Sequence, residues 1–245
     1  MVQVSLHCPF CNTTRVTKYG ICNGKQRYKC HNDACKRKTF YAEYTYNGSK
    51  PEVKKQIITM TTDSVGVRSI ARILGVSTAT VISDIKKKES ELSSTNTDYF
   101  ARHTHGRARK IRIKMDEMWS FYYSKDHQIW LWWAIDHDTG EVIAYWFGSR
   151  EHNNLGELKK LLSPLQIEIV YSDGNSAYSK GFSSKVLIVS KSNLQKIERK
   201  HLSLRTWSSR LVRDGIRFSK TEKMHKIAVG LVINIRFFGN KSLAQ

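Results

Sequence analysis

The 245-residue sequence lacks long apolar segments and a recognisable export signal. No run of about 18 uncharged apolar residues occurs, so a membrane-spanning helix is not expected. The first residues, MVQVSLHCPFC, do not show a basic segment followed by an apolar one, which excludes a typical secretory signal. The sequence therefore predicts a cytoplasmic protein without a membrane partner.

Acidic residues are scarce. Asp and Glu number 21 against 41 Lys and Arg, which gives a formal net charge of +20. An excess of this size usually has a polyanionic partner, and nucleic acid is the leading candidate because phosphate neutralisation releases counterions. An anionic membrane surface would instead require a basic amphipathic helix. The charge therefore favours a nucleic-acid-binding protein.

Cysteine is absent after residue 35, and this asymmetry indicates a local metal site rather than a disulfide framework. The pairs CPFC and CHNDAC flank a segment with a turn signal at NG, as in a zinc ribbon. Residues 1–46 are predicted to form this ribbon, and its small core makes folding dependent on Zn²⁺. The predicted zinc ligands are Cys8, Cys11, Cys30 and Cys35.

The second cysteine pair departs from the usual ribbon, because four residues separate its members instead of two. His31 could therefore replace Cys30 or Cys35 as a ligand. Reduced structural thiols without metal are the remaining alternative. Cys22 is predicted to be a packed or free thiol.

Residues 47–92 form the next predicted domain, in which GVRSIARILGVSTATVISDIKKK has helical periodicity. Gly75 is placed where a turn between helices requires a positive φ, and Ser77 where the next helix needs a cap. This spacing predicts a helix-turn-helix, although any two-helix hairpin of a bundle would also fit. The basic charge favours DNA binding. The predicted DNA contacts are Arg68, Ser77, Thr78, Thr80 and Lys86.

Residues 93–108 are polar and without periodicity, which predicts a linker. Basic residues without any acid run from its end into the next segment, as RHTHGRARKIRIK. This segment is either a solvated strand edge or a path for phosphates, and the sequence does not decide between the two.

Residues 109–245 are predicted to form an α/β domain. Three antiparallel strands come first, at 110–125, 128–136 and 141–148, and a helix at 153–164 follows, capped by Asn153 or Asn154. A strand at 167–173 follows through a helical crossover and is therefore parallel to its neighbour. A helix or loop at 178–182, a strand at 185–190 and a long helix at 194–215 complete the domain. The order is that of a ribonuclease H-like fold with a mixed five-stranded sheet.

Three acids are expected to converge in this domain. Asp116 lies on the first strand, Asp173 at the tip of the fourth and Glu198 on the long helix. Converging carboxylates repel one another unless a divalent cation joins them, and oxygen ligands of this kind suit Mg²⁺ or Mn²⁺. Gly174 would leave room for a phosphate beside the metal ions.

Each of these acids has an alternative interpretation. Asp173 could simply start a turn, and Glu198 could pair with a lysine of its own helix. Glu117 could replace Asp116, but strand alternation sends it to the opposite face. Asp136 and Asp138 flank a turn and are predicted to be turn formers.

Aromatic residues leave two further questions open. Trp130, Trp132 and Trp133 could stack on bases, although core packing is the better interpretation for those that face inward. Tyr178 is left open between a DNA contact and a core position.

The segments MDEMW, LLSP, SDGNSAY, QKIERKHLSLRTWSSRL and RFSK resemble transposases of the insertion sequence 1 family, and the resemblance covers nearly the whole chain. It implies a prokaryotic, nucleoid-associated DDE transposase in which Asp116, Asp173 and Glu198 hold the metal ions. The family commonly joins two reading frames by frameshifting, whereas this sequence is continuous. The DNA contacts expected on the long helix are Arg199, His201 and Arg205.

The sequence therefore predicts a DNA transposase that binds the terminal inverted repeats of an insertion sequence and catalyses metal-dependent strand cleavage and strand transfer. Its expected partners are double-stranded DNA, as element ends and target, and further copies of the chain in a homodimer or larger homo-oligomer. The alternatives are a non-enzymatic repressor that uses the first ninety residues, and a structure-specific nuclease that cuts without joining.

Overall fold

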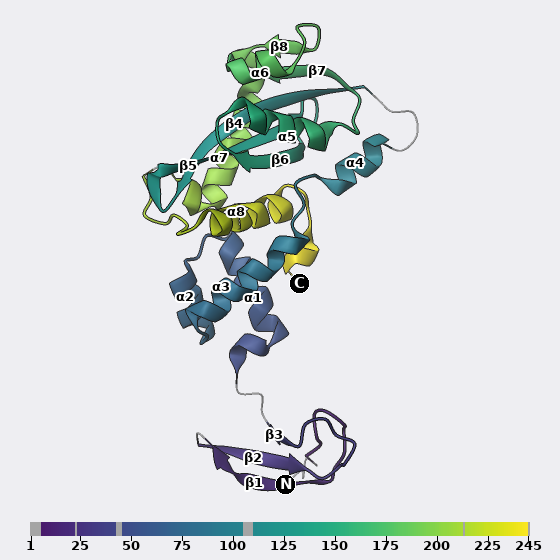
Figure 1. The fold of residues 1–245 in the computed structure, drawn as a ribbon, viewed down its shortest axis with the longest axis vertical. Coiled ribbons are helices and arrows are strands. Elements are labelled where there is room, and N and C mark those ends of the chain that lie inside the picture. The colour runs from purple at the N-terminus through teal and green to yellow at the C-terminus, as the bar shows by residue number, and fades with distance from the viewer. Residues whose placement is uncertain (1–5, 23, 43–45, 105–109, 213, 245) are drawn as a thin grey trace. The chain divides into compact units, whose positions relative to one another are not determined.

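The computed structural model describes residues 6–22, 24–42, 46–104, 110–212 and 214–244. The chain divides into two units, residues 1–50 and residues 51–245. The first unit contains a small sheet, and the second combines a helical region with a larger sheet (Figure 1). Within the described residues, no helix has the length and apolar character needed to cross a membrane.

The first unit is a three-stranded antiparallel sheet in the order β1-β2-β3. Its strands are β1 (Val16–Cys22), β2 (Lys25–Cys30) and β3 (Thr39–Tyr41). Gly24 has a φ of +72° in the turn between β1 and β2, a conformation that favours glycine. Its apolar cluster has four buried members, which are Cys8, Cys30, Cys35 and Phe40. So small a core cannot stabilise the unit by apolar burial alone.

The second unit begins with a helical region that contains the predicted helix-turn-helix. After the short 3₁₀ helix η1 (Asn47–Ser49), its helices are α1 (Pro51–Thr62), α2 (Val67–Leu74), α3 (Thr78–Lys87) and the 3₁₀ helix η2 (Lys88–Glu91). Gly75 ends α2 with a φ of +61°, and the Ser77 hydroxyl accepts a hydrogen bond from the Thr80 N–H at 3.1 Å. The glycine turn and the serine cap therefore stand where the sequence places them.

The larger sheet has five strands in the order β6-β5-β4-β7-β8. The strands are β4 (Ile111–Tyr122), β5 (Ser124–Asp136), β6 (Val142–Gly148), β7 (Ile167–Ser172) and β8 (Leu187–Val189). The first three are antiparallel to one another, whereas β7 is parallel to β4 and β8 is parallel to β7. This is the mixed sheet of a ribonuclease H-like fold, as predicted.

Helices cover both faces of this sheet. The helices are α5 (His152–Leu162), α6 (Ser176–Gly181), α7 (Gln195–Trp207) and α8 (Glu222–Arg236), with the 3₁₀ helices η3 (Lys191–Leu194), η4 (Ser209–Leu211) and η5 (Lys241–Ala244). Leu155 of α5 and Tyr178 of α6 share one core with Trp132, while Ile197 of α7 and Val229 of α8 share another with Trp133. Both tryptophans are fully buried, so core packing is their role.

Helix α8 was not predicted, and the long helix expected at 194–215 is instead α7, which ends at Trp207. Figure 1 shows α8 between the sheet and helices α1–α3. Val229 packs in the sheet core, whereas Leu231 packs in the core of the helical region with Ile70 and Val81. One helix therefore completes two cores and joins them into one unit.

The predicted linker is a packed segment in its described part, residues 93–104. It contains α4 (Thr97–Thr104), whose Tyr99 is fully buried and donates a hydrogen bond to Asp136 at 2.7 Å. Residues 105–108 of the predicted linker, and part of the basic segment, lie outside the described residues. The cap of α5 also differs, because Asn153 and Asn154 lie inside the helix and Glu151 precedes its first residue.

Candidate catalytic and metal sites

Strand pairing brings two of the three predicted acids alongside each other. Lys114 of β4 pairs with Tyr171 of the parallel strand β7. The same register, continued by two residues, places Asp116 beside Asp173, which directly follows the end of β7. Asp173 is half-buried, and its Oδ1 accepts a hydrogen bond from the backbone N–H of Asn175 at 3.0 Å. The Asn175 side chain also donates a hydrogen bond to Glu117 of β4, and this contact holds the Asp173 loop against the central strand.

Helix α7 brings the third acid to the same place. His201 lies one turn after Glu198, and its Nδ1 is 3.7 Å from Asp116 Oδ2. Glu198 is exposed, whereas the Asp116 side chain retains only 16% of its exposure. The helix therefore places Glu198 at the open side of the cluster and His201 at its buried side.

The electrostatics of Asp116 show how closely these groups interact. Burial and, after it, the negative charges of Glu117, Asp173 and Glu198 together raise the pKa of Asp116 to about 7, against the opposing effect of the hydrogen bond from the backbone N–H of Glu117. A carboxyl group in this setting resists ionisation until positive charge is supplied. The cluster thus has the donor chemistry and the uncompensated charge that suit a divalent cation.

The acids are more widely spaced than ligands around one ion. In the described part of the chain, they do not form a group of three or more ligand atoms all within 4.8 Å of one another. Two-metal sites distribute their ligands over ions about 3.5–4 Å apart, so a wider spacing is compatible with such a site. At Gly174 an added Cβ would have no atom within 4 Å, so the space beside Asp173 is open.

Glu117, which the sequence analysis considered only as an alternative to Asp116, is a buried member of this region. Its side chain is only 3% exposed on the opposite face of β4, as strand alternation requires. Its two carboxylate oxygens accept hydrogen bonds from Asn175 Nδ2 and from the Tyr178 hydroxyl. Burial raises the pKa of Glu117, and these two hydrogen bonds lower it. Tyr178 is accordingly a core residue with a polar contact to the site.

The prediction that His201 contacts DNA is wrong, because the His201 side chain is buried. Its ring stacks on Trp133 with 5.1 Å between ring centres, and its Nε2 accepts a hydrogen bond from Trp133 Nε1 at 2.6 Å. Burial and the charge of Arg205 lower its pKa to about 3, so the ring is neutral at pH 7. His201 therefore packs beside Asp116 in the interior, and its buried side chain offers no accessible surface to a DNA strand.

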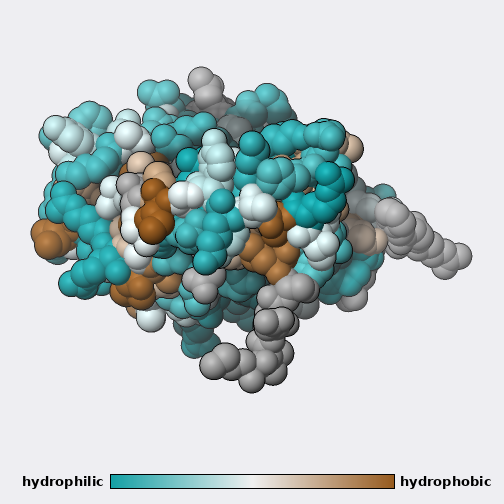
Figure 2. Space-filling model, turned by 90° about the horizontal axis from the view of Figure 1, so that it is seen from below, coloured by the Kyte–Doolittle hydropathy of each residue, from teal (hydrophilic) through white to brown (hydrophobic). Residues whose placement is uncertain are grey.

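The other predicted DNA contacts are accessible to differing extents. Arg199 is exposed, and Arg205 is half-buried on α7. In the helix-turn-helix, Thr80 is partly buried and its hydroxyl lies 2.8 Å from that of Ser77. The exposed members of that region are Arg68, Ser77, Thr78 and Lys86. The molecular face in Figure 2 is covered mainly by hydrophilic side chains.

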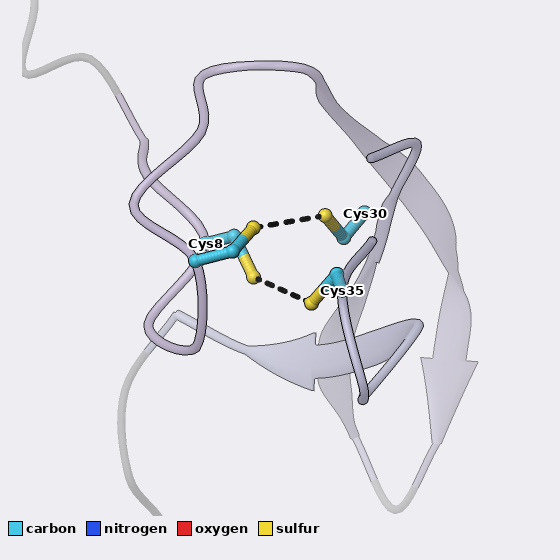
Figure 3. Close-up of side chains that lie close together, drawn as sticks. Cys8, Cys30 and Cys35 are labelled. Atoms are coloured by element: carbon cyan, nitrogen blue, oxygen red, sulfur yellow. Dashed lines mark hydrogen bonds between the residues drawn. The ribbon is translucent and has the colours of Figure 1, made fainter. Parts of the chain in front are cut away.

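The four predicted cysteine ligands form one cluster in the first unit, and their Sγ atoms all lie within 4.8 Å of one another. The sulfurs of Cys8 and Cys35 are 3.8 Å apart, and those of Cys11 and Cys30 are 3.6 Å apart. Figure 3 shows Cys8, Cys30 and Cys35 pointing toward a common centre. Tetrahedral Zn²⁺ with Zn–S bonds of about 2.3 Å holds its sulfurs about 3.8 Å apart, so the cluster fits this ion.

The alternative ligand His31 and the fifth cysteine, Cys22, are not members of this cluster. His31 Nε2 is hydrogen bonded with the Thr17 hydroxyl at 2.9 Å. Cys22 is a free, partly buried thiol. The wider spacing of the second cysteine pair therefore does not require a histidine ligand.

A ribonuclease H-like sheet with a carboxylate cluster at its central strand, attached to a helix-turn-helix, defines the class of DDE-type DNA-processing proteins. Residues 110–239 match the family described as IS1 transposase, and residues 44–89 match the InsA C-terminal domain. The first match covers more than half of the chain, and the chain belongs to the IS1 transposase family.

Similar proteins agree with this assignment. The chain is 37% identical over 128 residues to the insertion element IS1 protein InsB of Shigella sonnei, covering 52% of this chain and 98% of that protein. The identity is the same to the IS1 9 protein InsB of Escherichia coli K12, of which 77% is covered. A crystal structure of a pre-cleavage Mos1 transpososome is 11% identical with a TM-score of 0.27, over 85% of this chain and 84% of that one. A TM-score this low supports no conclusion.

Proposed function

We propose that this protein is a DNA transposase that cleaves the ends of its insertion sequence and joins them to target DNA. The observation that carries the proposal is the acidic surrounding of Asp116, in the segment that matches the IS1 transposase family. Asp116, Asp173 and Glu198 would hold Mg²⁺ or Mn²⁺. When bound, such ions activate the attacking oxygen and stabilise the leaving oxygen in phosphodiester chemistry.

The chain's own residues would keep this site in order. The backbone N–H of Asn175 fixes the orientation of Asp173. Trp133 donates a hydrogen bond to His201, and His201 packs beside Asp116. Strand cleavage and strand transfer are both in-line displacements at phosphorus, so one carboxylate site can serve both. No covalent bond between protein and DNA is needed.

The helix-turn-helix would recognise the terminal inverted repeats, with α3 in the major groove. Thr78 stands at the first position of α3, and Lys86 stands near its end. In this class of motif the first residues of the recognition helix contact base edges, whereas basic residues contact phosphates. Arg68, Ser77, Thr80, Arg199 and Arg205 are the other proposed DNA contacts.

The first unit would bind Zn²⁺ through Cys8, Cys11, Cys30 and Cys35 and assist in recognition of the ends. Two element ends must be joined in one reaction. A homodimer or larger homo-oligomer on DNA would provide matching sites for the two ends.

The substitution Asp173→Asn tests the catalytic proposal. The variant should bind a terminal-repeat duplex as the wild type does, because the helix-turn-helix is unchanged, but it should not nick the duplex in Mg²⁺. Asp214→Asn is the matched control, since the Asp214 side chain is 90% exposed and pairs with Lys125 at the surface. The control should cleave normally.

The outcomes separate the alternative functions. Cleavage retained by Asp173→Asn refutes the site. Binding without metal-dependent nicking by the wild-type protein favours a repressor. Nicking without joining to a target duplex, measured in a strand-transfer assay, favours a nuclease.

A further inference from the structure

Arg150 stands out among the arginines near the carboxylate cluster. Its Nε is 3.7 Å from Glu117 Oε1, and Glu117 directly follows Asp116 on β4. Its side chain is 60% exposed, although its partner is only 3% exposed. The contact thus joins a buried carboxylate beside the site to a guanidinium group that reaches solvent.

The loop that carries Arg150 is firmly built. The neighbouring Ser149 accepts a hydrogen bond from the buried Trp132 indole at its carbonyl oxygen, and another from Asn154 Nδ2 at its hydroxyl, both at 2.9 Å. On the other side of Ser149, an added Cβ at Gly148 would lie 1.9 Å from Asn154 Oδ1, so only glycine allows this approach. These contacts fix Ser149, the residue before Arg150.

The guanidinium group is positioned as well. It lies over the ring of Trp130, 4.7 Å from the ring centre, and Trp130 is half-buried on β5. Stacking on an aromatic face fixes the plane of a guanidinium group and leaves its edge free for hydrogen bonds. Trp130 is thus neither a fully buried core residue nor a free stacking surface, because it carries Arg150.

Arg150 differs from the structural arginines nearby in the atoms that it uses. Arg102 and Arg112 direct an Nη2 atom to the carboxylates of Glu141 and Asp138, at 2.6 Å and 2.5 Å. The contact of Arg150 with Glu117 is longer and uses Nε. A guanidinium group has five N–H donors in a planar fork, and this fork matches the geometry of a phosphate. At 60% exposure, the Arg150 side chain is accessible to such a group.

We propose that Arg150, held by Trp130 and Glu117, binds a DNA phosphate next to the one that reacts. Glu117 connects Arg150 to the carboxylates. Glu117 accepts a hydrogen bond from the Asn175 side chain, and the backbone N–H of Asn175 donates a hydrogen bond to Asp173. The inference rests on the proposed transposase function, and it adds a substrate-binding residue outside the three acids. Trp130 and Glu117 are positioning residues, since they act through Arg150.

The test combines an Arg150→Gln variant with DNA in which single phosphates near the cleavage site are replaced by neutral methylphosphonates. Arg150→Gln should slow single-turnover cleavage roughly 10- to 100-fold, the range of a lost charge-assisted hydrogen bond. It should also reduce the slope of log affinity against log salt by about 1. At one position, the methylphosphonate should slow cleavage by the wild-type protein as much as the substitution Arg150→Gln does. At that same position it should not slow cleavage by the Arg150→Gln variant any further.

Conservative variants distinguish phosphate binding from a purely structural role. Arg150→Lys should keep the salt slope of the wild type but cleave more slowly, because lysine offers no planar fork. Trp130→Phe should cleave better than Trp130→Ala, because phenylalanine preserves a ring under the guanidinium. Lys125→Gln is the matched control, because it also removes one positive charge from a side chain that is 63% exposed and has an ion pair of its own with Asp214, and it should leave the slope and the cleavage rate unchanged.

The inference is overturned if Arg150→Gln cleaves and binds as the wild type does, or if its effect adds to that of the methylphosphonate at every position. If the wild-type protein does not cleave at all, the proposed function fails. The salt slope and the methylphosphonate effect on binding still test Arg150 in that case.

Discussion

Replacing Leu231 by alanine tests whether α8 joins the helix-turn-helix and the sheet into one folding unit. Leu231 is fully buried among apolar residues of α1, α2 and α3. Removing a fully buried leucine side chain costs about 2–5 kcal/mol, from lost apolar burial and the remaining cavity. For a unit of about 195 residues, a loss near 3 kcal/mol lowers the Tm by roughly 6–12 °C.

The assay is urea unfolding followed by two signals. All six tryptophans lie at position 119 or beyond, so their fluorescence reports the sheet and α7, whereas far-UV circular dichroism reports the helices throughout. We expect both signals of Leu231→Ala to shift together to lower urea. Leu202→Ala is the matched control, because Leu202 is 64% exposed and its loss should change stability by less than about 0.5 kcal/mol. Loss of helix signal before the fluorescence changes would refute a single unit.

Two further predictions concern metal and pH. Chelation of the metal ion, or the substitution Cys35→Ser, should unfold the first unit and leave the second folded, as measured by limited proteolysis. The reason is that burial of Phe40 contributes only about 2 kcal/mol, against roughly 10–16 kcal/mol for structural zinc. A protease-resistant first unit without metal would contradict this prediction. Burial lowers the pKa of His225 to about 3, so this histidine binds a proton less readily in the folded state than in the unfolded state. The free energy of unfolding should therefore fall as the pH decreases from about 6.5, by about 1.4 kcal/mol per pH unit. His225→Gln should make this slope shallower in urea titrations at pH 5–7, and an unchanged slope would assign it to other groups.

The sequence was informative where local chemistry determines the structure. Gly75 and Ser77 occupy positions that their backbone and side-chain properties favour, and the structure has them there. Strand alternation placed Asp116 and Glu117 on opposite faces of β4, and their separate partners show that this is so. The turn-forming role of Asp136 is also confirmed, because its Oδ1 accepts hydrogen bonds from the backbone N–H groups of Asp138 and Thr139.

Local patterns did not reveal α4 and α8, for opposite reasons. Helix α8 is buried over most of its surface by two cores, so AVGLVIN shows no polar face and no amphipathic period. In helix α4 only Tyr99 is fully buried and most of the other residues are polar, so TDYFARHT resembles a linker. The burial of His201 likewise depends on Trp133 from a distant strand. The helices α4 and α8 and the burial of His201 all depend on packing between distant segments, which the periodicity within one segment does not reveal.

The same long-range packing determines how DNA recognition relates to the carboxylates. Between α1 and α2, the Ser64 hydroxyl donates to the carbonyl oxygen of Trp207 at 2.6 Å and accepts from the Ser209 N–H at 2.8 Å. These contacts fix the end of α7, the helix whose first turn carries Glu198. Arg236 of α8 strengthens the junction, because it pairs with the residue before Ser64 and lies over the Trp207 ring. The helical region contacts the end of α7 and shares a core with α8. Under the proposed function, a DNA end bound by α3 would therefore meet the carboxylates at a distance set by the fold rather than by a flexible linker.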